Sequence, residues 1–243
     1  TIIEMMEDIL FMADSDVIES VRNILKKNHV EIITSAKVVE IADGCTTYEK
    51  DGKRFNVNAE KVLVASGRVP LVDADELDRL GIRHNKGRIE TDERMRTNID
   101  NIYAIGDVNG KYMLAHVASH EGITAVDNIF GKDVKMSYNA VPQCIYLHPE
   151  IAWVGMTEKE AREKGYDIRV GKFPMLANGK SIAEGDSTGF VKIIADKKYN
   201  EILGIHMVCS HATDMIAECA LAINSELTAN EIVSAIHPHP TVS

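Results

Sequence analysis

The sequence predicts an incomplete doubly wound α/β part, followed by an α+β unit built on an antiparallel sheet. Three observations lead to this fold class. Residues 1–5, 14–27 and 30–34 follow a strand–helix–strand order, which favours a parallel pair of strands. Residues 61–65 form a continuous apolar run, typical of a strand buried on both faces. After Met136, several strand-like segments alternate with turns and capped helices.

The first strand–helix–strand unit is predicted from capping and periodicity. Asp14 or Ser15 can cap the start of the helix, and basic residues near its end complement its dipole. One face of this helix is apolar and is made by Val17, Ile18, Val21, Ile24 and Leu25. Glu4 ends the first strand, where a doubly wound sheet places the acid that binds a ribose diol. An ordinary surface glutamate is the plainer interpretation.

A short meander comes next, with strand-like segments at 37–42, 45–49 and 54–57. Asp51-Gly52 predicts a tight hairpin turn, because both central positions of such a turn need positive φ. The apolar run 61–65 then ends near Gly67, and a glycine at this end of a strand lets a ligand approach the backbone. A loop glycine without a ligand is the alternative.

The middle of the chain predicts a short helix at 75–80, a brief strand at 89–92 and a buried strand at 101–105. The last of these strands ends in Gly106-Asp107, ahead of a helix over 114–128. A carboxylate at Asp107 can accept hydrogen bonds from sugar-alcohol hydroxyls, and the helix start offers unpaired N–H groups. A simple turn is the alternative interpretation of the same residues.

The remaining chain predicts the α+β unit. Capping boxes at Thr157/Glu160 and Thr228/Glu231 mark two helices, and residues 211–224 predict a third. The expected strands are 141–146, 151–154, 168–173, 190–195 and 202–208.

Composition narrows the possible partners. The chain is 45% hydrophobic and 26% charged with a formal net charge of -10, so nucleic acid and anionic membrane surfaces are not expected partners. No apolar run approaches the ~18 residues that a membrane-spanning helix needs. The four cysteines lack metal-binding or disulfide-framework spacing, so we expect reduced thiols, a cytoplasmic location and no metal site.

The chain ends on two imidazoles, His237 and His239, and each precedes a proline. Proline restricts its own φ and keeps the preceding residue out of the helical region, so both histidines lie in a stiff, extended segment. Such a segment suits a base that must point at a substrate, since histidine titrates near neutral pH. A surface turn after a helix is the plainer interpretation of these residues.

Together these stretches resemble the flavin disulfide reductases, and within them the dihydrolipoamide dehydrogenases. The resemblance covers nearly the whole chain in order. It is carried by Tyr103-Ala104-Ile105-Gly106-Asp107, Met113-Leu114-Ala115-His116, Pro142 to Gly155 with His148-Pro149-Glu150, and His237-Pro238-His239-Pro240-Thr241. Met-Leu-Ala-His and His-x-His-Pro-Thr favour the lipoamide enzymes over glutathione or mercuric reductases.

The resemblance implies FAD and NAD as cofactors and assigns roles by position. Glu4, Val38 and Gly67 match nicotinamide-dinucleotide contacts, and Asp107 matches the acid that holds the flavin ribityl and phosphate region. His239 matches the base that takes a thiol proton from dihydrolipoamide in the partner subunit's active site, with a cis His239–Pro240 bond. The turn and helix start beneath the isoalloxazine match Met113, Leu114, Ala115 and His116.

The departures from the family pattern matter equally. The family uses Gly-x-Gly-x-x-Gly loops and a redox Cys-x-x-x-x-Cys pair, and this sequence has neither. We therefore expect a C-terminal fragment that is inactive alone, whose parent is a homodimer acting on a lipoyl-bearing protein of a 2-oxo acid dehydrogenase or related complex. The expected segments are 1–68 (NAD domain), 69–136 (FAD-domain return) and 137–243 (dimerisation domain). A glutathione- or mercuric-reductase-like enzyme and a non-catalytic dimerisation module remain alternatives.

Overall fold

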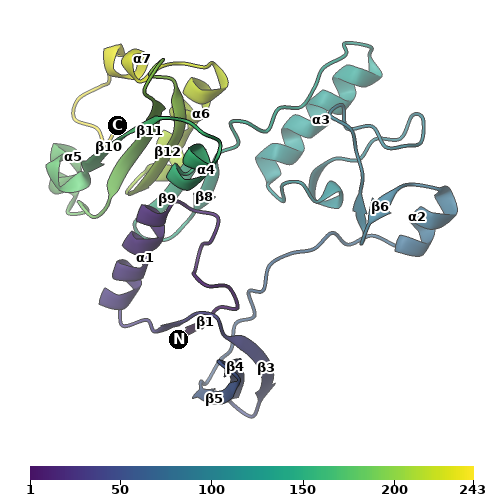
Figure 1. The fold of residues 1–243 in the computed structure, drawn as a ribbon, viewed down its shortest axis with the longest axis horizontal. Coiled ribbons are helices and arrows are strands. Elements are labelled where there is room, and N and C mark those ends of the chain that lie inside the picture. Colours follow the sequence, from purple (N-terminus) through teal and green to yellow (C-terminus); the bar gives the residue numbers. More distant parts are fainter. The chain divides into compact units, whose positions relative to one another are not determined.

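The computed structural model describes residues 1–243, which form two compact units (Figure 1). We call residues 1–62 together with 139–243 the sheet unit, and residues 63–138 the middle unit. The three segments 1–68, 69–136 and 137–243 are expected from the family resemblance, whereas the two units are defined by compactness, so the three segments stay a prediction.

The sheet unit begins with the expected strand–helix–strand order. Strands β1 and β2 pair in parallel, with Ile2 opposite Ile32, as the sequence predicts. Asp14 caps the intervening helix by accepting the N–H of Asp16. A three-stranded antiparallel sheet follows, and both residues of its Asp51-Gly52 turn have positive φ as expected. The elements are β1 (Ile2–Ile3), α1 (Ser15–Lys27), β2 (Ile32–Ile33), β3 (Lys37–Ala42), β4 (Cys45–Lys50) and β5 (Lys53–Asn58).

The rest of the sheet unit is the predicted α+β unit. Its five strands form an antiparallel sheet in the order β10-β11-β12-β9-β8. Both predicted capping boxes are present, at Thr157 and Thr228. The elements are β8 (Gln143–Ile145), β9 (Glu150–Gly155), α4 (Glu158–Glu163), β10 (Ile168–Pro174), a 3₁₀ turn (Met175–Ala177), α5 (Gly179–Glu184), β11 (Phe190–Asp196), β12 (Ile202–Cys209), α6 (Ala212–Asn224) and α7 (Ala229–Ser234).

Helices cover both faces of this sheet, so every residue of β12 is buried. Because successive side chains of a strand point to opposite faces, β9 and β12 contribute to two cores. Ile151, Trp153 and Val208 pack with the apolar face of α1. The other core joins the sheet to α6 through Ala152, Val154, Ile205, Met207, Ile216 and Cys219.

The middle unit is smaller and contains less regular structure. Its helix α2 ends at Leu80, and the C-cap residue Gly81 has positive φ. Of the brief strand expected at 89–92, only Ile89 lies in a strand, the two-residue β7. The elements are α2 (Ala74–Leu80), β6 (His84–Asn85), β7 (Arg88–Ile89), a 3₁₀ turn (Gly106–Asn109) and α3 (Ala115–Ile129).

Two expected strands are absent. The apolar run 61–65 pairs with nothing and is exposed, with Leu63 90% accessible. Residues 101–105 form only a single bridge, between Tyr103 and Arg96, although Ala104 is buried. Apolar composition makes a strand only where neighbouring strands can satisfy its backbone groups, and within this chain residues 61–65 have no such neighbour, while residues 101–105 pair only with residues 95–97. None of the helices combines the length and apolar character needed to cross a membrane.

Candidate functional site

A tight turn at Gly106–Asn109 presents the carboxylate of Asp107 in the middle unit. Gly106 adopts φ +71°, and its N–H donates a hydrogen bond to Glu121 Oε2 at 2.6 Å. The side chain of Asp107 is half exposed, and its Oδ2 lies 3.9 Å from Nη1 of Arg68. Asp107 can therefore accept hydrogen bonds from a ligand, with a guanidinium close by that sequence reasoning missed.

The start of α3 also offers hydrogen-bond donors. Leu114 is the N-cap residue and makes no side-chain capping bond, and the first turn contains no acidic residue. Met113 precedes this cap, while Ala115 and His116 are the first two helical residues. A helix start without a side-chain cap carries a partial positive charge, which favours an electron-rich or anionic group.

Glu4 and Val38 lie on neighbouring segments of the sheet unit. Glu4 directly follows β1, and its main-chain oxygen accepts the N–H of Ala36, just ahead of β3. Its carboxylate accepts only the N–H of Met6, at 2.8 Å. Val38 is exposed on β3. Gly67, with φ +94°, belongs to the middle unit.

The C-terminal segment holds its two histidines differently. His237 pairs with Glu218 through Nε2 and Oε1 at 2.9 Å, and its Nδ1 lies 3.0 Å from the main-chain oxygen of Ala235. The hydrogen bond with Glu218 raises the pKa of His237. His239 is exposed, makes no hydrogen bond or ion pair, and precedes a cis peptide bond to Pro240 as expected.

Anchors lie on both sides of His239. On one side is the His237–Glu218 pair. On the other, Asn178 Nδ2 donates to the main-chain oxygens of Thr241 and Val242 at 3.3 Å, and Val242 is buried in the core beneath α6. An exposed imidazole is thus held between two fixed points.

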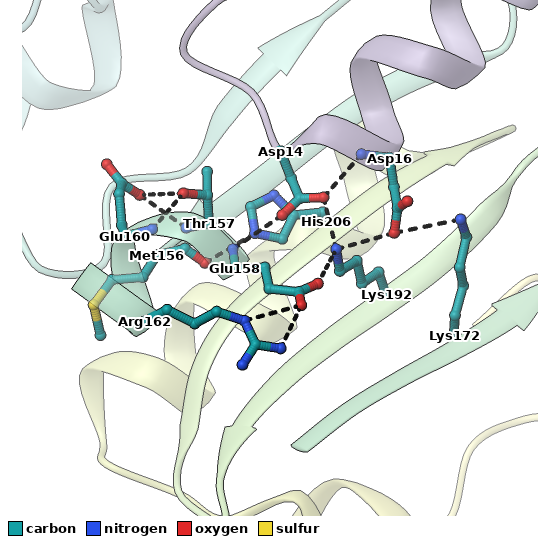
Figure 2. A network of polar contacts seen from close by, with 10 residues as sticks. All are labelled: Asp14, Asp16, Met156, Thr157, Glu158, Glu160, Arg162, Lys172, Lys192 and His206. Atoms are coloured by element: carbon teal, nitrogen blue, oxygen red, sulfur yellow. Dashed lines mark hydrogen bonds and ion pairs between the residues drawn. The ribbon is translucent and has the colours of Figure 1, made fainter. Parts of the chain in front are cut away.

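The sheet unit also contains a buried ionic group, the Lys192 cluster, made of Lys192, Asp14, Asp16 and Glu158 (Figure 2). The side chain of Lys192 is 1% accessible, and its ammonium lies 2.7 Å from Asp14, 3.0 Å from Asp16 and 2.9 Å from Glu158. Sequence reasoning missed this cluster, although a lysine within the apolar strand Phe190–Asp196 is a visible signal.

A metal centre is not among the features of the site. No group of three or more His, Cys, Asp or Glu side chains is arranged to hold a metal ion. All four cysteines are free thiols. Burial raises the pKa of Cys209 to about 12 and that of Cys219 to about 12, so neither is a ready nucleophile.

Comparison with family models identifies both parts of the chain. Residues 1–122 match the model described as pyridine nucleotide-disulphide oxidoreductase, and residues 141–243 match the dimerisation domain of the same group. The chain belongs to the pyridine nucleotide-disulphide oxidoreductase family. The resemblance inferred from the motifs is therefore confirmed at the level of the family.

Relatives within this pyridine nucleotide-disulphide oxidoreductase family match every residue of the chain. It is 42% identical to dihydrolipoyl dehydrogenase of Bacillus subtilis and 41% identical to that of Mycobacterium tuberculosis, over 100% of this chain and 53% and 54% of those proteins. The chain spans about half the length of the curated relatives it matches.

Solved structures of the family share the fold. The HOCl-induced flavoprotein disulfide reductase RclA from Escherichia coli aligns with a TM-score of 0.87 and 29% identity, over 98% of this chain and 56% of that protein. LpdA from Mycobacterium tuberculosis aligns with a TM-score of 0.89 over 99% of this chain and 53% of that protein. At 24% identity, the second match supports the fold alone.

Proposed function

We propose that this chain is part of an FAD-dependent oxidoreductase that oxidises protein-bound dihydrolipoamide and passes hydride to NAD⁺. The observation that carries the proposal is the 42% identity to a dihydrolipoyl dehydrogenase over all of the chain. These residues contain no Cys-x-x-x-x-Cys pair, which the family resemblance implies for exchange with the substrate. The 243 residues alone are therefore expected to be inactive.

His239 is the proposed base. Thiol–disulfide exchange needs a thiolate, so a base that removes the thiol proton accelerates attack on a disulfide. The exposed ring of His239, free of partners in its own chain, supports this role. The matched dimerisation domain supports a homodimer in which His239 serves the partner subunit's redox disulfide.

Asp107, Met113, Leu114, Ala115 and His116 fit an FAD site. The half-exposed carboxylate of Asp107 would accept hydrogen bonds from ribityl hydroxyls. The uncapped start of α3 would stabilise negative charge on the ring system. Bound FAD would supply the electron transfer between thiols and nicotinamide.

Glu4, Val38 and Gly67 are the proposed NAD contacts. The carboxylate of Glu4 keeps acceptor capacity at the carboxyl end of β1, where a parallel sheet binds a ribose diol. Val38 offers an exposed apolar side chain on β3. Gly67 leaves open space around its Cα, which allows close approach of a ligand to the backbone.

The proposed partner of the parent enzyme is a lipoyl-bearing protein of a 2-oxo acid dehydrogenase or related complex, in the cytoplasm. The names of the relatives support the lipoyl substrate, and the free thiols support a reducing compartment.

The test is the full-length protein assayed for NADH formation with dihydrolipoamide and NAD⁺ and, in parallel, for oxidation of NADH or NADPH with oxidised glutathione and with Hg²⁺. His239→Gln is expected to lower dihydrolipoamide turnover ~10²- to 10⁴-fold, the usual contribution of a general base, with the flavin absorbance unchanged. His148→Gln is the matched control, because His148 is also exposed and followed by proline. Turnover with glutathione or Hg²⁺ but not with dihydrolipoamide would contradict the proposed substrate. Turnover by residues 1–243 alone would contradict the expectation that they are inactive.

A further inference from the structure

We propose that Glu121 is a positioning residue, whose buried carboxylate fixes the 106–109 turn and so aims Asp107 at the flavin. This inference rests on the proposed FAD site. Glu121 lies on the buried side of α3, in line with Val117, Thr124, Ala125 and Asn128. Its side chain is fully buried, which is rare for a carboxylate without a cationic partner.

Three neutral donors satisfy this carboxylate. Oε2 accepts the main-chain N–H of Gly106 at 2.6 Å and the side-chain N–H of Asn109 at 2.8 Å. Oε1 accepts the hydroxyl of Tyr138 at 2.6 Å. Glu121 takes part in no ion pair. A buried carboxylate held only by neutral groups is a costly way to stabilise a fold, so a role in the site explains it better.

The two hydrogen bonds to Glu121 Oε2 hold the turn on either side of Asp107. Gly106 immediately precedes Asp107, and the buried side chain of Asn109 follows two residues later. The turn also lies close against α3. A Cβ added at Gly106 would meet the Cβ of Ala118 at 3.2 Å, and one added at Gly122 would meet Ile105 at 3.3 Å. The backbone that carries Asp107 is therefore set by contacts with α3, and Glu121 is the polar part of them.

The chemistry of a carboxylate suits this task. One oxygen can accept two donors at once, while the other stays available for the Tyr138 hydroxyl. Glutamine keeps an oxygen for Gly106 and Asn109, and its amide can donate to the hydroxyl oxygen of Tyr138. Alanine removes all three bonds. Glu121→Gln should therefore rescue the positioning that Glu121→Ala destroys.

Tyr138 provides a reporter that does not depend on flavin. Burial, and then the hydrogen bond to Glu121, raises the pKa of Tyr138 above its ordinary value. Replacing the carboxylate by an amide removes the negative charge that disfavours the tyrosinate. The pKa of Tyr138 should fall in Glu121→Gln, as seen by ultraviolet difference titration, with Tyr138→Phe identifying its signal among those of the other tyrosines.

The experiment uses the full-length protein, stripped of flavin and titrated with FAD. Glu121→Ala should weaken FAD binding ~10- to 100-fold, because it removes all three hydrogen bonds to the buried carboxylate. The FAD affinity of Glu121→Gln should stay within ~3-fold of that of the unmodified protein. Glu93→Ala is the control, because Glu93 pairs with Lys135 on the surface of the same unit. Unchanged affinity and unchanged visible circular dichroism in Glu121→Ala would overturn the positioning role.

A second variant covers the case in which Glu121→Ala does not fold. Asn109→Ala leaves α3 intact and removes one of the two bonds to the turn, so FAD binding should weaken ~3- to 10-fold. Native affinity in Asn109→Ala would contradict the proposal. If the native full-length protein binds no FAD, the proposed function fails instead, and an unaltered Tyr138 titration in Glu121→Gln would then refute the geometry of Glu121 by itself.

Discussion

The two units of this chain bury carboxylates in opposite ways. In the sheet unit, Asp14 is 1% accessible and pairs with the buried ammonium of Lys192. In the middle unit, Glu121 is fully buried and contacts only neutral donors. Lys192 and Asp14 are 178 residues apart in sequence, whereas the partners of Glu121 lie within 17. The first arrangement joins distant segments, and the second shapes one local turn.

Asp14 shows how the sheet unit uses its charges. One oxygen caps α1 through the N–H of Asp16 and also accepts from Lys192. The other accepts the N–H of Glu158 at 3.0 Å, at the start of α4. A single carboxylate thus connects α1, α4 and β11 (Figure 2).

The pKa values of Asp14 and Lys192 reflect a balance between burial and hydrogen bonding. Burial alone would raise the pKa of Asp14, but the hydrogen bonds from Lys192, Glu158 and Asp16 outweigh it and lower the pKa. Burial would likewise lower the pKa of Lys192, and the three surrounding carboxylates raise it instead. Both groups therefore stay charged, so the removal of one partner leaves the other buried and uncompensated.

The largest effect is expected from Lys192→Met in the full-length protein. This change leaves Asp14 without its cation, and breaking a buried pair in this way typically costs ~3 to 5 kcal/mol of unfolding free energy. Lys197→Met is the matched control, since its pair with Asp167 is exposed and such pairs contribute ~0 to 1 kcal/mol. Urea unfolding followed by circular dichroism measures both.

The double variant Asp14→Leu with Lys192→Met sharpens the same comparison. Removing both charges takes away the uncompensated carboxylate, so the double variant should be more stable than Lys192→Met alone. If Lys192→Met and Lys197→Met lose the same small amount of unfolding free energy, the Lys192 cluster stabilises the protein no more than a surface ion pair does. The Lys192 cluster and Glu121 would then differ in their contacts but not in a measured contribution of the cluster to stability.

The fold was most predictable where local sequence and burial agree. The apolar face of α1 with its Asp14 cap, the Asp51-Gly52 turn and both capping boxes lie where the pattern puts them. Residues 61–65 show the limit of such patterns. Their apolar composition indicates that the segment suits a buried sheet, but it does not indicate whether neighbouring strands are present to pair with it.

The candidate site was predictable only in part. Asp107 and His239 lie in recognisable motifs, and the structure places both where they are accessible. Their supports are long-range contacts that no local pattern encodes, such as Arg68 beside Asp107 or Asn178 beside Thr241. Glu121 is the exception. A charged residue at helical spacing within a buried stripe is visible in the sequence and predicts a satisfied polar contact.

A second, smaller effect concerns acid stability near the Lys192 cluster. His206 is fully buried, and burial lowers its pKa. Its Nε2 lies 3.0 Å from the main-chain oxygen of Met156, while its Nδ1 has no partner. The unfolded state therefore binds more protons than the folded state between the lowered pKa and ~6.5, and stability falls as pH drops through this window.

His206→Gln tests this proton linkage. Glutamine keeps a donor for Met156 but does not titrate, so the pH dependence below ~6.5 should flatten by up to ~1.4 kcal/mol per pH unit. The comparison is urea midpoints measured from pH 7.5 down to 5. An unchanged slope would mean that the imidazole becomes charged inside the sheet unit. Asp14 does not confuse the measurement, because its lowered pKa places its effect at more acidic pH.

The smallest effect is expected at the surface pair of His237 and Glu218, because this pair is partly exposed whereas Asp14 and Glu121 are buried. The hydrogen bond from Glu218 raises the pKa of His237, so its stabilisation is present below ~6.5 and is lost as pH rises through the raised value. Glu218→Gln should return the pKa toward the ordinary value, seen by NMR of the imidazole protons. Because the pair is partly exposed, unfolding free energy should change by less than ~1 kcal/mol. A larger loss would show that this pair, like the Lys192 cluster, holds distant segments together, and that the segment carrying His239 depends on it.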